Sequence, residues 1–176
     1  ETAPASLKAL VAGSYPDAES KTGQFNYSNV GYNILSTWLD QQSDLSWQQQ
    51  LQTLIFTPLQ MQHSSTLVSE AKRKNWMLAK PYSAMSPTPA QELYLQKTDR
   101  TMHAAGGMLA TAPDLAKFLI AQMQDGGAVF PETVIKKAQQ TEVVTDSNYN
   151  DFNRSGYAWG WYSGDYKGER MLPVSY

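Results

Sequence analysis

Residues 23–35 read GQFNYSNVGYNIL and carry the chain from a glycine turn into an apolar-periodic helix. Ser28 or Asn29 can cap this helix, because either side chain can accept a hydrogen bond from a free amide of the first turn. If the backbone is extended across these positions, Tyr27 and Asn29 face the same side, since side chains two residues apart point the same way. The helix dipole favours an anion there. The stretch therefore suits Tyr27 as a general base and Asn29 as a positioning amide.

This stretch resembles the second motif of the serine β-lactamase and penicillin-binding-protein superfamily. In the class C β-lactamase-like branch the motif is Tyr-x-Asn, often within Gly-x-x-Phe-x-Tyr-Ser-Asn-x-Gly-Tyr. Residues 103–115, HAAGGMLATAPDL, are similar to the family pattern Ala-Gly-Gly-Leu-x-Ser-Thr-x-x-Asp-Leu-x-x-Phe. The paired glycines of this stretch allow a close backbone approach or a positive φ. Residues 56–61, FTPLQM, resemble its Pro-Leu-Gly-Met turn, with Gln60 replacing glycine. The resemblance implies acyl transfer in which Tyr27 is the general acid/base and Asn29 orients a lysine and the substrate amide.

The family's other two motifs are Ser-x-x-Lys, which carries the nucleophile and precedes the tyrosine, and a later Lys-Thr-Gly or His-x-Gly. Ser69-Glu70-Ala71-Lys72 fits the first pattern, but it follows Tyr27 and continues into a charged run that suggests a solvated face. Lys21-Thr22-Gly23 fits the third pattern, but it precedes Tyr27 in a loop, so Gly23 is better explained as a turn glycine. Neither match is therefore expected to be catalytic.

We accordingly expect a fragment of a class C-like serine hydrolase that acts on a β-lactam, a D-alanyl peptide or an ester. Without its own nucleophile and third motif, the chain by itself is predicted to be inactive. The alternative is a non-catalytic helical module that binds a partner.

Helices are predicted wherever apolar residues recur at helical spacing. The first covers residues 30–41 and has an apolar stripe. The second includes Trp47 to Ile55 and ends before Pro58, because the residue before a proline is biased out of the α region. Two more are expected: one runs from a capping-box-like start made by Thr111 with Asp114 to the glycines at 126–127, and the other begins at Pro131. Their predicted inward residues are Leu115, Phe118, Leu119, Met123, Val134, Ile135 and Ala138.

The predicted fold class is mainly α with a C-terminal β-hairpin, the incomplete helical region of the β-lactamase/transpeptidase-like α/β fold. We expect a helical domain over residues 1–150, and a linker with two strands of an otherwise missing sheet over 151–176. Residues 148–155 are read as polar linker, and 157–162 and 171–176 as the strands. The first strand would lack a neighbouring sheet, and such an edge invites homo-oligomers.

Composition excludes several classes of function. The chain has 176 residues, a formal net charge of -2 and no cysteine, so nucleic acid is not an expected partner and thiolate metal sites are excluded. His63 and His103 stand alone, without ligand spacing, so no metal or other cofactor is predicted. No apolar run reaches membrane-spanning length, and residues 1–4 do not read as a signal peptide. By resemblance, the complete enzyme acts on a small-molecule or peptidoglycan-type substrate and is periplasmic or secreted.

Overall fold

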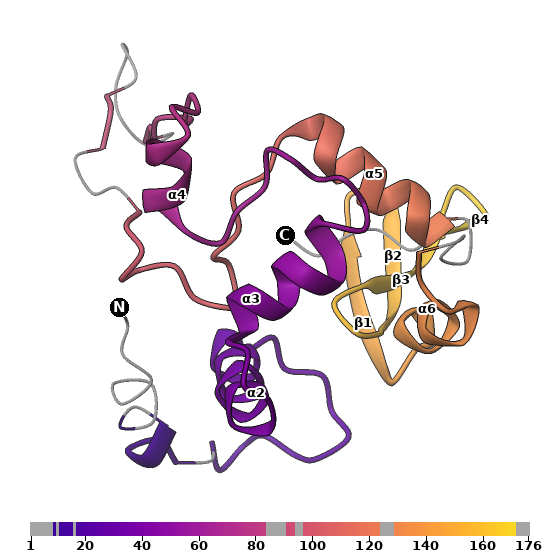
Figure 1. The fold of residues 1–176 in the computed structure, drawn as a ribbon. Helices are drawn as coiled ribbons and strands as arrows, with labels where there is room; N and C mark the ends of the chain where they lie inside the picture. Colours follow the sequence, from indigo (N-terminus) through magenta and orange to yellow (C-terminus); the bar gives the residue numbers. More distant parts are fainter. Residues whose placement is uncertain are drawn as a thin grey trace. The chain divides into compact units, whose positions relative to one another are not determined.

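The computed structural model describes residues 9, 11–15, 17–83, 91–93, 97–123 and 129–171. The chain forms two compact units: unit 1 is Glu1–Ser14 with Ser28–Phe118, and unit 2 is Tyr15–Tyr27 with Leu119–Tyr176. Figure 1 follows the chain through the helices of unit 1 and then the strands of unit 2. The boundary between the units cuts the predicted motif, so Tyr27 belongs to unit 2 and Asn29 to unit 1.

Unit 1 contains the helix that the sequence predicts most clearly. α2 (Asn29–Gln42) confirms the prediction for residues 30–41. Ser28 is its N-cap, with extended backbone angles of φ -143 and ψ 112, and its side chain accepts a hydrogen bond from Gly31 N–H at 3.2 Å. α4 (Val68–Arg73) is a short helix with buried Val68 and Ala71.

The second predicted helix is present but changes type along its length. α3 (Trp47–Leu51) starts with a capping box between Ser46 and Gln49, and continues as the π-helix η1 (Gln52–Phe56). Thr57 has φ -67 and ψ -51, and its N–H donates to Gln52 O, so the expectation that residue 57 leaves the α region was wrong.

The apolar stripe of α2 is largely exposed, and most of the predicted inward face of α5 (Ala112–Met123) was wrong. On α2, Val30, Ile34 and Trp38 are 51%, 43% and 53% exposed, and the buried residue is Ser36. α5 exposes the predicted core residues Leu115, Leu119 and Met123 and buries Asp114, Ala121 and Gln122. Periodicity locates an apolar stripe, but it does not show what covers that stripe.

Unit 2 contains α6 (Glu132–Gln139), which buries Ile135 as predicted and leaves Val134 exposed. Its sheet is antiparallel in the order β1-β2-β3-β4, with β1 (Val143–Tyr149), β2 (Phe152–Tyr157), β3 (Tyr162–Tyr166) and β4 (Glu169–Met171). The described residues thus hold more strands than the predicted hairpin, so the expected fold class is confirmed only in part. No helix in the described ranges is long and apolar enough to cross a membrane.

Two strand predictions need correction. Residues 148–155, expected to be a linker, instead form the end of β1, its turn and most of β2. Residues 157–162 are the end of β2, a turn and the start of β3, and Tyr157 pairs with both Val143 and Tyr162. The expectation that this stretch has no neighbouring sheet was therefore wrong. The predicted returning strand is described only at Met171, because residues 172–176 lie outside the described part.

Candidate functional site

Tyr27 lies at the surface of unit 2, with 48% of its area exposed. Aromatic contacts hold the segment that leads to it: the Phe25 ring lies 4.8 Å from the Tyr157 ring and 5.8 Å from the Tyr162 ring, between centroids. Gly23 has a φ of 86°, a conformation that favours glycine, so it is the turn glycine that the sequence predicts. The phenol of Tyr27 is thus accessible to solvent and is not sealed in a core.

Asn29 is the first residue of α2 and is exposed. The sequence left open whether Ser28 or Asn29 caps this helix, and the structure assigns the cap to Ser28. Asn29 is therefore not needed as the cap. The catalytic roles of Tyr27 and Asn29 remain predictions.

The two misplaced motif matches occupy ordinary surface positions. Ser69 lies in α4, where its N–H donates to Asp99 Oδ1 at 2.9 Å. Burial opposes ionisation of Asp99, but hydrogen bonds from the Ser69 hydroxyl and from the Ser69 and Val68 backbone hold its pKa below the ordinary value. Lys72 is exposed. Lys21-Thr22-Gly23 lies in a turn closed by Gln24 N–H donating to Lys21 O at 3.1 Å, and not in a strand.

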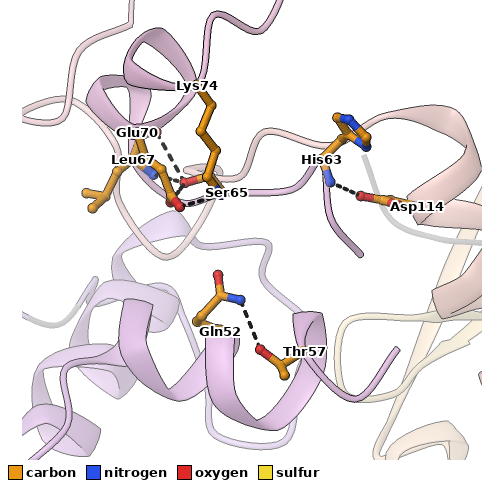
Figure 2. A network of polar contacts seen from close by, with 8 residues as sticks. All are labelled: Gln52, Thr57, His63, Ser65, Leu67, Glu70, Lys74 and Asp114. Atoms are coloured by element: carbon orange, nitrogen blue, oxygen red, sulfur yellow. Dashed lines mark hydrogen bonds and ion pairs between the residues drawn. The ribbon is translucent and has the colours of Figure 1, made fainter. Parts of the chain in front are cut away.

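Asp114 is a polar centre of unit 1 that the sequence did not reveal in full. Its side chain is almost fully buried, and Oδ2 accepts the His63 backbone N–H at 2.7 Å and the Ser64 hydroxyl at 3.0 Å, while Lys117 Nζ lies 2.9 Å from Oδ1. Figure 2 shows the contact between His63 and Asp114. Burial alone would raise the pKa of Asp114, but these donors outweigh it and lower the pKa. The predicted Thr111 cap is present, with Asp114 N–H donating to Thr111 Oγ1 at 3.4 Å.

A second polar network surrounds Ser65. Its backbone forms a two-way bridge with Leu109, at 2.9 Å and 2.7 Å, and its hydroxyl donates to Glu70, which also pairs with Lys74 at 2.8 Å (Figure 2). The hydrogen bond from Lys74, followed by the one from Ser65, lowers the pKa of Glu70. This network borders a groove of about 490 Å³ in unit 1, lined by Gln48, Gln49, Gln52, Thr66, Leu67, Ser69, Glu70, Arg73 and Lys74.

The paired glycines of the second family-like stretch allow the close backbone approach that the sequence predicts. A Cβ added to Gly107 would lie 2.4 Å from His103 N and 2.5 Å from His103 O. The other histidine, His63, packs its ring 5.6 Å from that of Trp76. Among the residues that the structure describes, no three His, Cys, Asp or Glu side chains gather closely enough to hold a metal ion.

Comparison with known proteins places this geometry in context. Penicillin-binding protein 4 of Amycolatopsis lactamdurans is 26% identical over 147 residues, which cover 81% of this chain and 38% of that protein. The octameric penicillin-binding protein homologue from Pyrococcus abyssi is similar in structure, with a TM-score of 0.81 at 22% identity over 97% of this chain and 37% of its own. A D-stereospecific amidohydrolase from Streptomyces sp. gives a TM-score of 0.66 at 19% identity over 92% of this chain and 45% of its own.

The chain thus spans about two fifths of the length of these relatives. The solved structures share its fold. The sequence pattern of the Beta-lactamase family matches residues 5–175, which is nearly the whole chain, and this chain therefore belongs to that family.

Proposed function

We propose that this chain is the Tyr-x-Asn-bearing part of a class C β-lactamase-like serine hydrolase, which cleaves its substrate through an acyl-serine intermediate. Family membership supports the reaction class. The similar proteins are described as a penicillin-binding protein and a D-stereospecific amidohydrolase, which supports a β-lactam or a D-amino peptide as substrate. An ester is the third candidate, from the resemblance to the class C branch. The observation that carries the proposal is the exposed phenol of Tyr27 directly before a helix whose cap is Ser28.

In the complete enzyme, Tyr27 accepts the proton of the nucleophilic serine and later returns it to the leaving group. A proton relay of this kind contributes about 10²- to 10⁴-fold to a rate. Asn29 orients the catalytic lysine and the substrate amide by donating and accepting hydrogen bonds. The exposed position of Asn29, together with the assignment of the cap to Ser28, leaves its carboxamide available for this role.

The nucleophile is supplied by sequence that this chain does not contain. No Ser-x-x-Lys precedes Tyr27, and the backbone N–H of Ser69 donates to the carboxylate of Asp99. The exposed apolar stripe on α2 supports the view that further polypeptide covers it in the whole enzyme. The chain alone is accordingly inactive, and the complete enzyme works in the periplasm or outside the cell, as its likeness to a penicillin-binding protein suggests.

Covalent labelling with a fluorescent penicillin tests this proposal. The complete enzyme, expressed from the whole reading frame, is expected to be acylated on a serine outside this chain, and Ser69→Ala is expected to leave the labelling unchanged. The isolated chain is expected to stay unlabelled. Mass spectrometry that locates the adduct on Ser69, or on any other serine of these residues, would contradict the proposal.

A further inference from the structure

Arg154 occupies an unusual position in the sheet of unit 2. Its guanidinium carbon lies 4.2 Å from the ring centroid of Tyr162 and 4.7 Å from that of Tyr149. The two rings come from the strands on either side of β2, because Tyr149 ends β1 and Tyr162 begins β3. Thr145 donates its hydroxyl to Arg154 O at 2.6 Å, which fixes the backbone at the same point. The cation is therefore held in place by three neighbouring strands.

This cation has no anionic partner in the described part of the chain. The ion pairs found there join lysines to Asp114 and to four glutamates, and none uses Arg154. Arg154 is half-buried, and its Nε is enclosed without a hydrogen-bond acceptor. Stacking on aromatic rings compensates a guanidinium only in part, and a buried donor without an acceptor is unfavourable. A bound anion would satisfy the charge and the exposed end of the guanidinium.

Irregular strand pairing places Arg154 on the face of the sheet that carries the rings of Tyr149 and Tyr162. The register shifts between Val144 and Ser147 in β1, and again between Arg154 and Gly156 in β2. In a regular strand, Arg154 and Tyr157 would point to opposite faces because they are three positions apart. The extra residue at the second bulge brings them to the same face, and re-aiming a side chain is a common role of such bulges.

The residue opposite Arg154 on β3 shows how closely the bulge constrains the sheet. Gly164 pairs with Arg154, and a Cβ added to it would lie 1.8 Å from Asn153 O. The site therefore requires glycine there. It presents one cation beside the ring of Tyr149, which is 62% exposed. The local surface thus combines a positive charge with an apolar ring.

We propose that Arg154 binds a carboxylate that is attached to an apolar or aromatic group. The planar guanidinium can donate two parallel hydrogen bonds to the two oxygens of a carboxylate, and the exposed ring beside it favours an anion that carries an apolar group. The apolar part of the ligand lies against Tyr149. This site does not depend on the acyl-transfer role proposed for Tyr27, so the two proposals can fail separately.

Titration of this chain with benzoate tests the assignment, with benzamide as a neutral ligand of the same shape. Binding is followed through the arginine Nε–H and tyrosine ring signals by NMR at constant ionic strength. Benzoate is expected to bind saturably and benzamide at least tenfold more weakly. Arg154→Gln is expected to weaken benzoate binding at least tenfold, and Arg154→Lys, which keeps the charge without the planar fork, is expected to weaken it severalfold. The control Arg170→Gln changes an exposed arginine on β4 and is expected to leave binding unchanged.

Equal binding of benzoate and benzamide would overturn the proposal, as would benzoate affinity that survives Arg154→Gln. Inorganic phosphate that binds more tightly than benzoate would overturn the carboxylate preference. If Arg154→Gln does not fold, Tyr149→Ala replaces it, because this exposed ring can be removed at small cost to the sheet. Severalfold weaker benzoate binding by that variant supports the proposal, and unchanged binding overturns it.

Discussion

The buried carboxylate of Asp114 accepts the backbone N–H of His63 at 2.7 Å, and this bond ties the loop before α4 to the first turn of α5. Lys117, one turn further along α5, pairs with the same carboxylate and also donates to Gln60 O. Two turns of chain that are far apart in sequence are thus joined through a single ionised side chain. These contacts connect the family-like turn at residues 56–61 with the end of the family-like stretch at residues 103–115.

Asp114→Asn is expected to destabilise the protein by about 2 kcal/mol, because the amide cannot replace both the charge-assisted bonds and the ion pair with Lys117. Urea unfolding monitored by tryptophan fluorescence gives the change in free energy. Asp146→Asn serves as the control, since Asp146 is exposed. An equal free energy of unfolding for Asp114→Asn and Asp146→Asn would show that the Asp114 contacts contribute nothing to stability.

Acid is expected to weaken the fold through the same group. The pKa of Asp114 is lower in the folded chain than its ordinary value of 3.8, because the hydrogen bonds from Lys117, His63 and Ser64 outweigh the effect of burial. A lowered folded pKa means that the stabilisation is fully present above the ordinary value and is lost as the pH falls through the folded value. Unfolding free energies measured from about pH 7 down to about pH 3 should therefore fall more steeply for the native chain than for Asp114→Asn. Parallel curves would refute the linkage.

Gln60 has a φ of 54°, a left-handed conformation, at the position where the family-like turn has glycine. A non-glycine residue pays about 1–2 kcal/mol for this backbone region, while glycine loses about 0.5–1 kcal/mol more conformational entropy on folding. Gln60→Gly is therefore expected to stabilise the protein slightly, by about 0.5 kcal/mol. Gln62→Gly, two positions on, gains no such relief and is expected to destabilise it. Thermal unfolding of both variants decides, and a lower melting temperature for Gln60→Gly would contradict the strain argument.

Ser28 and Asn29 are neighbours at the start of α2 but have different roles: Ser28 caps the helix, and Asn29 is proposed to position the catalytic lysine and the substrate. Ser28→Ala removes the acceptor of Gly31 N–H and is expected to cost about 1 kcal/mol of stability. Asn29→Ala is expected to change stability by less than about 0.5 kcal/mol, because an exposed side chain at this position makes no cap. Urea unfolding compares the two variants. A large loss of stability for Asn29→Ala would give Asn29 a structural role and weaken its assignment as the positioning amide.

The sequence predicted what depends on near neighbours along the chain. α2 follows from its cap and its apolar period, the turn at Gly23 from its glycine, and the close approach at Gly107 from the paired glycines. Each of these features is decided within a few residues. The Tyr-x-Asn resemblance, which led to the family, has the same local character.

What the sequence could not predict depends on distant partners or has no pattern of its own. Asp114 read as a helix-start residue because its partners His63 and Ser64 are 51 and 50 positions away. The hairpin of β1 and β2 read as a linker because its tip is mostly polar and its two aromatic residues, Tyr149 and Phe152, stand three positions apart, so the alternation that marks a strand is missing. Asn150 makes that turn with a φ of 51°, a conformation that asparagine tolerates. The asparagine was the local sequence signal for this turn. The π turn of η1 has no local sequence pattern that separates it from an ordinary α-helix.

Hydrolysis of nitrocefin by the complete enzyme, with and without Tyr27→Phe, tests the central claim most directly. The phenol is proposed to relay the proton of the attacking serine, so its loss is expected to lower kcat about 10²- to 10⁴-fold. The melting temperature should be unchanged, because Tyr27 is half-exposed, and Tyr15→Phe, at a more exposed tyrosine, should keep full activity. A Tyr27→Phe enzyme that turns over nitrocefin at the native rate would contradict the account.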